Sequence, residues 1–115
     1  MVSTNTNNVM EEIAHNLGYR SVFDFTRIQI QTLLLQKIAY YQSRIDIYEQ
    51  KYSMNFEEFR RRVVDKNDSG LSKFGIIEKE DDDNNWGDAV DFVKIYFQKL
   101  QILLPRMKLF SNFKR

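Results

Sequence analysis

Cysteine is absent from this chain of 115 residues, and histidine occurs only once, at His15. Without cysteine the chain cannot form a disulfide scaffold, a thiol nucleophile or a thiolate metal site. Without a second histidine or a cysteine, a nucleophile–base triad cannot be assembled either. We therefore expect that the protein is not an enzyme and that it holds no metal and no cofactor. The lack of cysteine also fits a reducing cytosol, so we expect a cytoplasmic protein.

Long hydrophobic runs are missing as well. The longest aliphatic runs have three residues, as in 33–35 and 102–104, which is far too short for a membrane span. The first eight residues are polar and lack the apolar core of a signal peptide. Hydrophobic residues nevertheless make up 43% of the chain, which is enough for a folded core. We therefore expect no membrane association, a flexible tail at residues 1–8 and a single helical domain at residues 9–115.

Two heptad patterns predict the main helices. Between residues 31 and 52, and again between residues 85 and 104, large apolar residues recur at alternating steps of four and three. This period places them along one side of an α-helix, as in a coiled coil. The seams, which are of equal length, are Leu34, Ile38, Tyr41, Ile45, Tyr48 and Tyr52, then Trp86, Val90, Val93, Phe97, Leu100 and Leu104. They predict a mainly α fold with a long helical hairpin that ends at Pro105, and they leave open whether the seams pair within one chain or between two.

Shorter helices are predicted before and between these two. Residues 9–17 favour a helix that Gly18 brings to an end. Asn55 and Glu58 have the spacing of a helix cap, in which each side chain bonds to the backbone of the other. A short intervening helix is therefore expected at residues 56–66.

Other segments favour different structures or admit two interpretations. Ser21 and Asp24 resemble a helix start, but the alternation of apolar and polar residues within 21–32 is typical of a strand. Residues 74–78 are compatible with a brief strand, and an acidic linker is expected at residues 80–85. The prediction thus leaves open whether one or two short strands accompany the helices.

The charges nearly cancel, at a net +1, but they are unevenly distributed. Residues 78–91 hold seven acids and one base, whereas residues 92–115 hold six bases and no acid. These segments could form two partner surfaces. We favour instead the interpretation that they complement each other within the fold or are simply solvated. Arginines 60–62 fan out around a helix instead of forming one stripe, so we interpret them as solvated rather than as a phosphate-binding patch.

A polar stretch after the short helix matches the first half of a calcium-binding EF-hand loop. Asp65, Asn67 and Ser69 occupy positions of oxygen ligands, and Gly70 follows at the turn. The twelfth position of such a loop requires a bidentate carboxylate, but here it is Ile76. Because the main charge of the cage is missing, we interpret the stretch as a polar turn without bound calcium.

Trp86 lies where the acidic run meets the apolar helix, and tryptophan is enriched among binding hot spots. A helix that is apolar on more than one face is expected to leave apolar surface exposed for a partner. The acids that precede this helix would steer a basic partner toward that surface. The alternative is that Trp86 packs in the protein's own core. The candidate partner-binding residues are Trp86, Val90, Val93 and Phe97 on the apolar helix and Asp81, Asp82 and Asp83 on its acidic approach.

Residues 48–59 read Tyr-Glu-Gln-Lys-Tyr-Ser-Met-Asn-Phe-Glu-Glu-Phe. This segment resembles one in small prokaryotic companion proteins of two-gene toxin–antitoxin modules, where a charged long helix ends in Lys-Tyr-Gly-Met-(Ser/Thr) before a Glu-Glu-Phe helix. An acidic spacer and a tryptophan-containing helix follow there, as in residues 81–88 here. In this chain Ser53 replaces the turn glycine, and Asn55 replaces the Ser/Thr cap, which is chemically equivalent. The resemblance covers about residues 40–92 and implies an antitoxin-like protein that binds a protein partner.

Three functions are therefore compared. The first and expected one is a protein-binding companion, antitoxin-like, that covers a small ribonuclease-type toxin or another partner enzyme through its helical apolar surface. The second is a small nucleic-acid-binding regulator that uses arginines 60–62 and the basic C-terminus. The third is a structural homo-oligomer built on the two seams.

Overall fold

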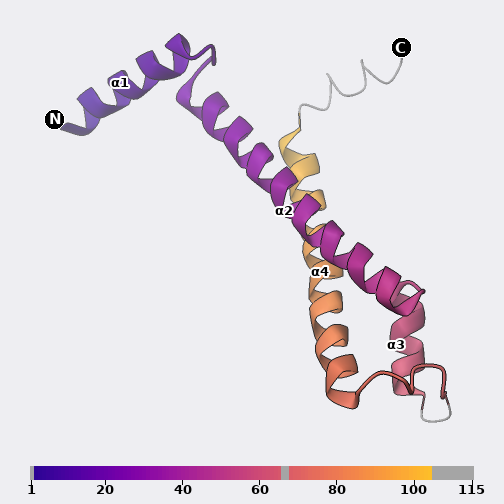
Figure 1. Ribbon diagram of the computed structural model, residues 1–115. Coiled ribbons are helices and arrows are strands. Elements are labelled where there is room, and N and C mark those ends of the chain that lie inside the picture. The colour runs from indigo at the N-terminus through magenta and orange to yellow at the C-terminus, as the bar shows by residue number, and fades with distance from the viewer. Residues whose placement is uncertain (1, 66–67, 105–115) are drawn as a thin grey trace, which may run out of the picture. The chain divides into compact units, whose positions relative to one another are not determined.

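The computed structural model describes residues 2–65 and 68–104. Within these residues the chain forms helices α1 (Val2–Asn16), α2 (Val22–Tyr52), α3 (Phe56–Val64) and α4 (Ile76–Leu103) (Figure 1). No strand occurs in this described part, so the predicted mainly α fold is confirmed. The chain divides into two compact units. Among the described residues, we call 2–35 and 100–104 the terminal unit, and 36–65 and 68–99 the central unit.

Several segments differ from the expectation. Residues 2–8, expected as a flexible tail, belong to α1. Residues 22–32 continue α2, so the strand alternative is wrong there. The strand at 74–78 and the acidic linker at 80–85 are wrong as well, because α4 begins at Ile76 and runs through both. In each case the cooperative hydrogen bonding of a longer helix prevails over the local pattern.

Gly18 ends α1, as predicted, through its backbone geometry. Its φ of 95° lies in the left-handed region, which glycine adopts without strain. The Tyr19 N–H donates to the Ala14 carbonyl oxygen at 2.9 Å, and the Gly18 N–H donates to that of His15 at 3.0 Å. These two bonds close a Schellman motif. The His15 ring nitrogen Nε2 lies 2.7 Å from the carbonyl oxygen of Arg20, which fixes the turn further.

The start of α2 is capped by side chains of the terminal unit. The Asp24 N–H donates to Ser21 Oγ at 3.0 Å, which confirms the predicted helix start. The Val22 N–H donates to Glu11 Oε1 at 3.1 Å, so α1 supplies a second acceptor. Asp24 also pairs with Arg27 at 2.8 Å, and this hydrogen bond lowers the pKa of the Asp24 carboxyl. Two of the first N–H groups of α2, those of Val22 and Asp24, therefore have side-chain acceptors.

The last turn of α4 is held against α2 in the terminal unit. The Leu103 carbonyl oxygen accepts hydrogen bonds from Arg27 Nη1 at 3.3 Å and from Gln31 Nε2 at 2.8 Å. A cation and an amide thus satisfy a carbonyl at the negative end of the helix dipole. Pro105, the predicted stop, lies outside the described residues, and α4 ends two residues before it.

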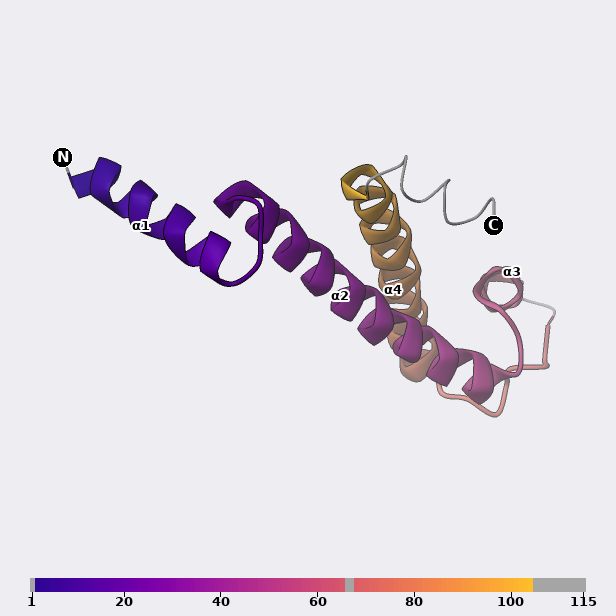
Figure 2. The same ribbon diagram turned by 90° about the horizontal axis from the view of Figure 1, so that it is seen from above.

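Aromatic side chains fill the core of the central unit, where α2, α3 and α4 meet (Figure 1, Figure 2). The Tyr52 ring centroid lies 4.4 Å from that of Phe59 and 4.6 Å from that of Phe74. The Glu58 N–H donates to Asn55 Oδ1 at 2.9 Å, so the predicted cap of α3 is confirmed. The buried core residues of this unit are Ile45, Tyr48, Tyr52, Phe59, Leu71, Trp86 and Ala89.

The predicted seams face inward, with one exception. Every member of the α2 seam is buried or half-buried. On α4, however, Phe97 keeps 49% of its surface exposed, so its place in the buried seam was wrongly predicted. The neighbouring Tyr96 stacks on Tyr41 instead, with ring centroids 6.3 Å apart. The next seam members, Leu100 and Leu104, are again buried or half-buried, so the departure from the heptad line is local to Phe97.

Candidate protein-binding groove

Trp86 lies in the core of the central unit and not on its surface. Its side chain is fully buried. The indole stacks on the rings of Tyr48 and Tyr52, at centroid distances of 5.7 and 6.0 Å, and lies 4.9 Å from the ring of Phe59. Of the two interpretations left open by the sequence, the structure agrees with core packing. In this conformation Trp86 offers no area to a partner.

Asp82 belongs to a polar network inside the central unit. Its Oδ2 accepts hydrogen bonds from Lys51 Nζ and from the Tyr52 hydroxyl, each at 2.6 Å, and Lys51 also contacts Glu78 Oε2 at 2.6 Å. The hydrogen bond to Asp82 raises the pKa of Lys51 above its ordinary value, and the bond to Glu78 adds to this. Burial, followed by the same carboxylate, raises the pKa of Tyr52. The network joins the end of α2 to the start of α4, so Asp82 is occupied.

The other two predicted acids have different environments. Asp83 is half-buried, and its Oδ1 lies 3.6 Å from Arg60 Nε, an ion pair too long for a hydrogen bond. Asp81 is exposed and has no hydrogen bond or ion pair within the described residues. The acidic run is therefore divided: Asp82 and Asp83 face the protein, and Asp81 alone faces solvent.

The remaining predicted residues are also divided. Val90 and Val93 are half-buried and pack against the aromatic core. Phe97 is half exposed. Of the seven candidates, only Phe97 and Asp81 are exposed, and they lie more than four turns apart on α4. The predicted residues therefore do not form one continuous surface.

A groove of the central unit lies elsewhere, between α2 and α4. It encloses about 290 Å³ and is lined by Tyr40, Tyr41, Arg44 and Tyr48 of α2 and by Asn85, Asp88, Ala89 and Phe92 of α4. The Tyr41 ring packs against Tyr40 and Phe92, with centroids 5.0 and 4.9 Å away. Tyr40 is 56% exposed and Phe92 is 37% exposed. Two aromatic rings therefore keep open faces beside polar groups, as in many binding sites.

The charged groups of the groove have few partners of their own. Arg44 is held by Tyr48: its Nη2 lies 3.1 Å from the hydroxyl, and its guanidinium carbon lies 5.5 Å from the ring centroid. Asp88 is exposed and makes no hydrogen bond or ion pair within residues 2–65 and 68–104. An arginine therefore lies at the Tyr48 part of the groove, and an unpaired carboxylate lines its α4 side.

Other acids extend the negative charge along α4. Glu80, Asp81 and Asp91 are exposed, and none of them forms an ion pair with a described residue. Asp81 precedes Asp88 by seven residues, so the two lie on the same side of the helix. No base occurs between residues 80 and 91. The approach to the groove from α4 is therefore negatively charged.

The sequence contained a partial signal for this groove. Asp88 and Phe92 are four residues apart, which places them on one face of a helix beside the seam. Tyr40 directly precedes Tyr41 of the heptad seam, so the sequence places a second aromatic ring beside the seam. Exposure of Tyr40 and Phe92 depends on the distance between two helices, which periodicity does not specify.

The three consecutive arginines are engaged by the protein's own carboxylates. Arg60 pairs with Asp83, Arg61 contacts Glu58, and Arg62 lies 2.9 Å from Glu58 and 3.8 Å from Asp68. The hydrogen bonds from Arg61 and then Arg62 lower the pKa of Glu58. A phosphate would have to compete with these acids, so the arginines do not form a ready nucleic-acid surface.

Neither a metal centre nor a membrane span is found in the part of the chain that the structure describes. No group of three or more histidine, aspartate and glutamate side chains there could hold a metal ion. None of the described helices combines the length and the apolar character needed to cross a bilayer. Asn67, one of the predicted polar-turn residues, lies outside the described residues.

The chain was also compared with known proteins. No protein-family model, no curated protein and no solved structure matches it.

Proposed function

We propose that this chain is a protein-binding companion, antitoxin-like in its role, and that the groove of the central unit receives a basic segment of the partner. The observation that carries the proposal is the combination of exposed aromatic rings at Tyr40 and Phe92 with the unpaired carboxylate of Asp88. The resemblance of residues 48–59 to companion proteins of toxin–antitoxin modules supports the class of partner.

The chemistry of the groove favours a cationic side chain. An arginine or lysine that lies over an exposed aromatic ring gains a cation–π interaction. The same cation can form a charge-assisted hydrogen bond with the Asp88 carboxylate, which has no competing partner. Arg44, which lies on the α2 side of the groove beside Tyr48, would then bind a carboxylate or carbonyl oxygen of the partner. The groove therefore selects a segment that carries a base beside an acceptor.

The exposed acids on α4 would act before the partner touches the groove, through long-range attraction. Glu80, Asp81 and Asp91 would attract a basic partner and so increase the association rate, an effect that salt screens. An RNA-cleaving enzyme has a basic substrate surface, because it must bind phosphates. Covering that surface would block the substrate sterically, which requires no chemistry from the companion itself.

The nucleic-acid alternative has less support. Arginines 60–62 are paired with Glu58, Asp68 and Asp83, and the unpaired acids of α4 would repel phosphates. The basic residues beyond 104 lie outside the described residues. The observations therefore favour a protein partner over a nucleic acid.

The test is co-purification of the chain with the product of the adjacent gene, followed by association kinetics at low and high salt. Asp88→Asn and Phe92→Ala should each weaken the complex by roughly tenfold, which corresponds to about 1.4 kcal/mol. Glu57→Gln is the matched control, since Glu57 is exposed, unpaired and on α3, away from the groove residues. A complex that forms equally well with all three variants would reject the groove as the binding site.

A further inference from the structure

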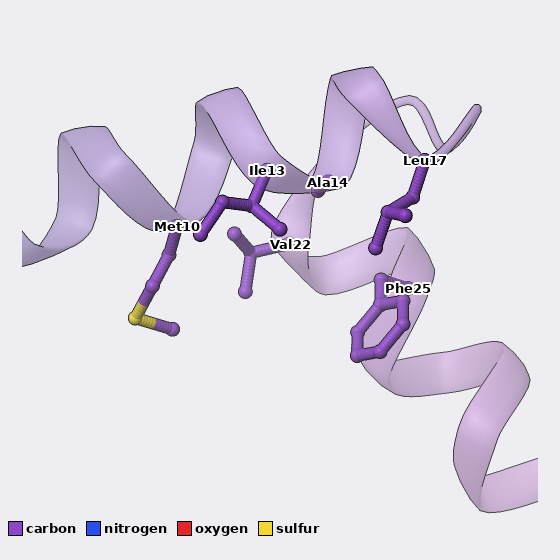
Figure 3. A pocket seen from close by; sticks show the side chains of 6 residues that line it. All are labelled: Met10, Ile13, Ala14, Leu17, Val22 and Phe25. Carbon is purple, nitrogen blue, oxygen red and sulfur yellow. The ribbon is translucent and has the colours of Figure 1, made fainter.

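Two hollows of the molecule differ in the chemistry of their linings. The hollow between α1 and the start of α2, in the terminal unit, is lined by apolar side chains alone, so it offers no polar group that would orient a ligand (Figure 3). A pocket of the central unit lies where the end of α2, α3 and residues 70–74 meet. It encloses about 430 Å³, which is within the range of small-molecule sites.

Three bases from separate parts of the chain line this pocket. Lys51 comes from α2, Arg62 from α3, and Lys73 from the segment that precedes α4. Glu58 is the one acid among the lining residues, and it accepts hydrogen bonds from Arg61 and Arg62. The charged groups at the wall are therefore three cations and one carboxylate that already has its own partners.

Lys51 is held in place by two acids of α4 that do not line the pocket. Its Nζ lies 2.6 Å from a carboxylate oxygen of Asp82 and 2.6 Å from one of Glu78. The hydrogen bond to Asp82, followed by that to Glu78, raises the pKa of Lys51, so its ammonium group stays charged. A ligand in the pocket therefore meets a positioned cation, although α4 neutralises part of its charge.

Lys73 is the base that remains available. It is exposed and has no hydrogen bond or ion pair with any residue that the structure describes. Its Nζ lies 5.2 Å from the ring centroid of Phe74, and Lys51 Nζ lies 5.8 Å from the same centroid. The ring attracts both ammonium groups, but the two groups repel each other. An anion beside Phe74 would offset this repulsion and would give Lys73 the acceptor that it lacks.

The backbone at the end of α2 adds donors to the same wall. Tyr52 is the last residue of α2, and Ser53 follows it with a φ of 57°, in the left-handed region. A right-handed helical residue followed by a left-handed one turns successive N–H groups toward one concave side, and such a nest binds anions. Because Tyr52 and Ser53 both line the pocket, the nest lies at its wall.

We propose that this pocket binds a phosphate group, with Lys73 as its main cationic contact and with Lys51 and the backbone of Ser53 as further donors. A phosphate group carries close to two negative charges near neutral pH and has several acceptor oxygens, so it can bind donors that lie on different sides of it. The pocket is larger than a phosphate ion, and Leu71 and Phe74 supply an apolar part of its wall. The ligand is therefore either inorganic phosphate or the phosphate end of a small monoester.

Isothermal titration calorimetry of the full chain at low salt, with inorganic phosphate and separately with phenyl phosphate, tests the proposal. Lys73→Gln should raise the dissociation constant of either probe by roughly tenfold, since it removes the unpaired ammonium group. Lys94→Gln is the matched control: it removes the same charge from an exposed residue of α4 that lines neither the pocket nor the groove, and it should leave binding unchanged. Tighter binding of phenyl phosphate would identify a monoester as the ligand, and equal binding would identify the inorganic ion.

An NMR titration of the isotope-labelled full chain with inorganic phosphate locates the site. The amide signals of residues 51–54 and 70–74 should shift in a saturable way, whereas those of residues 40–44 and 85–92, which hold most of the groove, should not. Lys73 is exposed, so its replacement should not disturb the fold, and unchanged far-UV circular dichroism would verify this.

Three outcomes would overturn the proposal: no saturable binding of either probe at millimolar concentration, equal weakening by both variants, or amide shifts confined to other parts of the chain. The pocket shares no lining residue with the groove, and the assay contains only this chain and a small anion. Its result is therefore separate from the proposed binding of a partner protein. Asp88→Asn and Phe92→Ala, which test that function, should leave phosphate binding unchanged.

Discussion

The central unit and the terminal unit both contain stretches of α2 and α4, but they bury their apolar side chains to different degrees. In the central unit seven apolar residues are buried in one cluster. In the terminal unit only Ala14 and Leu100 are buried among the described residues. The large apolar residues that this unit leaves exposed are Val9, Met10, Ile13, Leu17, Phe23, Ile30, Leu33, Leu35 and Ile102. Stability should therefore reside mainly in the central unit.

The difference has a structural cause. In the central unit Phe59 of α3 closes the cluster over Tyr52 of α2 and Trp86 of α4, with ring centroids 4.4 and 4.9 Å away. In the terminal unit the ties between α2 and α4 include polar ones, from Arg27 and Gln31 to a helix-end carbonyl. Polar ties of this kind fix geometry but contribute less to stability than buried rings. A unit whose helices are held in place but whose apolar side chains stay exposed is suited to binding another surface.

The largest expected effect compares two aromatic residues, one from each unit. Trp86→Ala should lower the free energy of unfolding by about 3–5 kcal/mol, because it removes a fully buried ring from the core. Phe23→Ala, which removes a mostly exposed ring, should change it by no more than about 0.5 kcal/mol in dilute protein. Urea unfolding followed by circular dichroism measures both. Similar losses in the two variants would show that the units do not differ in stability as their burial suggests.

The next effect separates two neighbouring acids of the central unit. Asp82→Asn should cost about 1–3 kcal/mol, since Lys51 would lose one of its two counter-charges, keeping only Glu78, and Tyr52 would lose a charged acceptor. Asp81→Asn is the control and should have almost no effect, because Asp81 is exposed and unpaired. Equal unfolding curves for both variants would mean that the network contributes nothing to stability.

Much of the helical fold could be predicted from the sequence, but its division into two units was not, since a single domain at residues 9–115 was expected. The heptad seams correctly marked the faces along which α2 and α4 pack, because periodicity reports which residues share a face. The start of α4 was missed, because six acids within twelve residues resemble a solvated linker. Lys51 and Arg60 neutralise Asp82 and Asp83 there, and both bases come from distant parts of the sequence. No local pattern contains such a pairing.

The candidate site was predicted less well than the fold. Trp86 has the same sequence signature whether it anchors a partner or fills a core, since both uses place an aromatic residue at the edge of an apolar helix face. The strand alternative at 21–32 arose because Thr26, Ile28 and Ile30 alternate with polar residues. In the helix, the Thr32 hydroxyl donates a hydrogen bond to the Ile28 carbonyl oxygen at 3.1 Å, so this polar side chain has a partner within its own helix. These outcomes depend on neighbours in space, which a single sequence does not give.

A smaller effect compares the left-handed residues of the two units. Gly18, in the terminal unit, has a φ of 95°, and Ser53, in the central unit, has a φ of 57°. Gly18→Ala should lower stability by about 1 kcal/mol, because an L side chain is strained there, although nothing lies within 4 Å of the added methyl group. Ser53→Gly should raise stability by up to about 1 kcal/mol by relieving the same strain. Thermal unfolding of both variants measures this, and a loss in Ser53→Gly would show that the serine hydroxyl contributes more than the strain costs.

The smallest effect concerns acid, and it compares a carboxyl in each unit. Lys51 lowers the pKa of Glu78 below its ordinary 4.5, and Arg27 lowers that of Asp24 below its ordinary 3.8. A lowered pKa in the folded state means that the unfolded state binds more protons, so each carboxylate contributes stability above its ordinary pKa. That contribution is lost as the pH falls through the lower, folded value. Glu78→Gln should therefore flatten the decline of urea stability below pH 4.5, whereas Glu57→Gln should not, because Glu57 has no ion-pair partner. The effect is small because the Glu78 side chain is 43% exposed and solvent screens its ion pair with Lys51. A decline equally steep in the Glu78→Gln protein would assign the acid sensitivity to the remaining carboxyls, with Asp24 of the terminal unit as the next to replace.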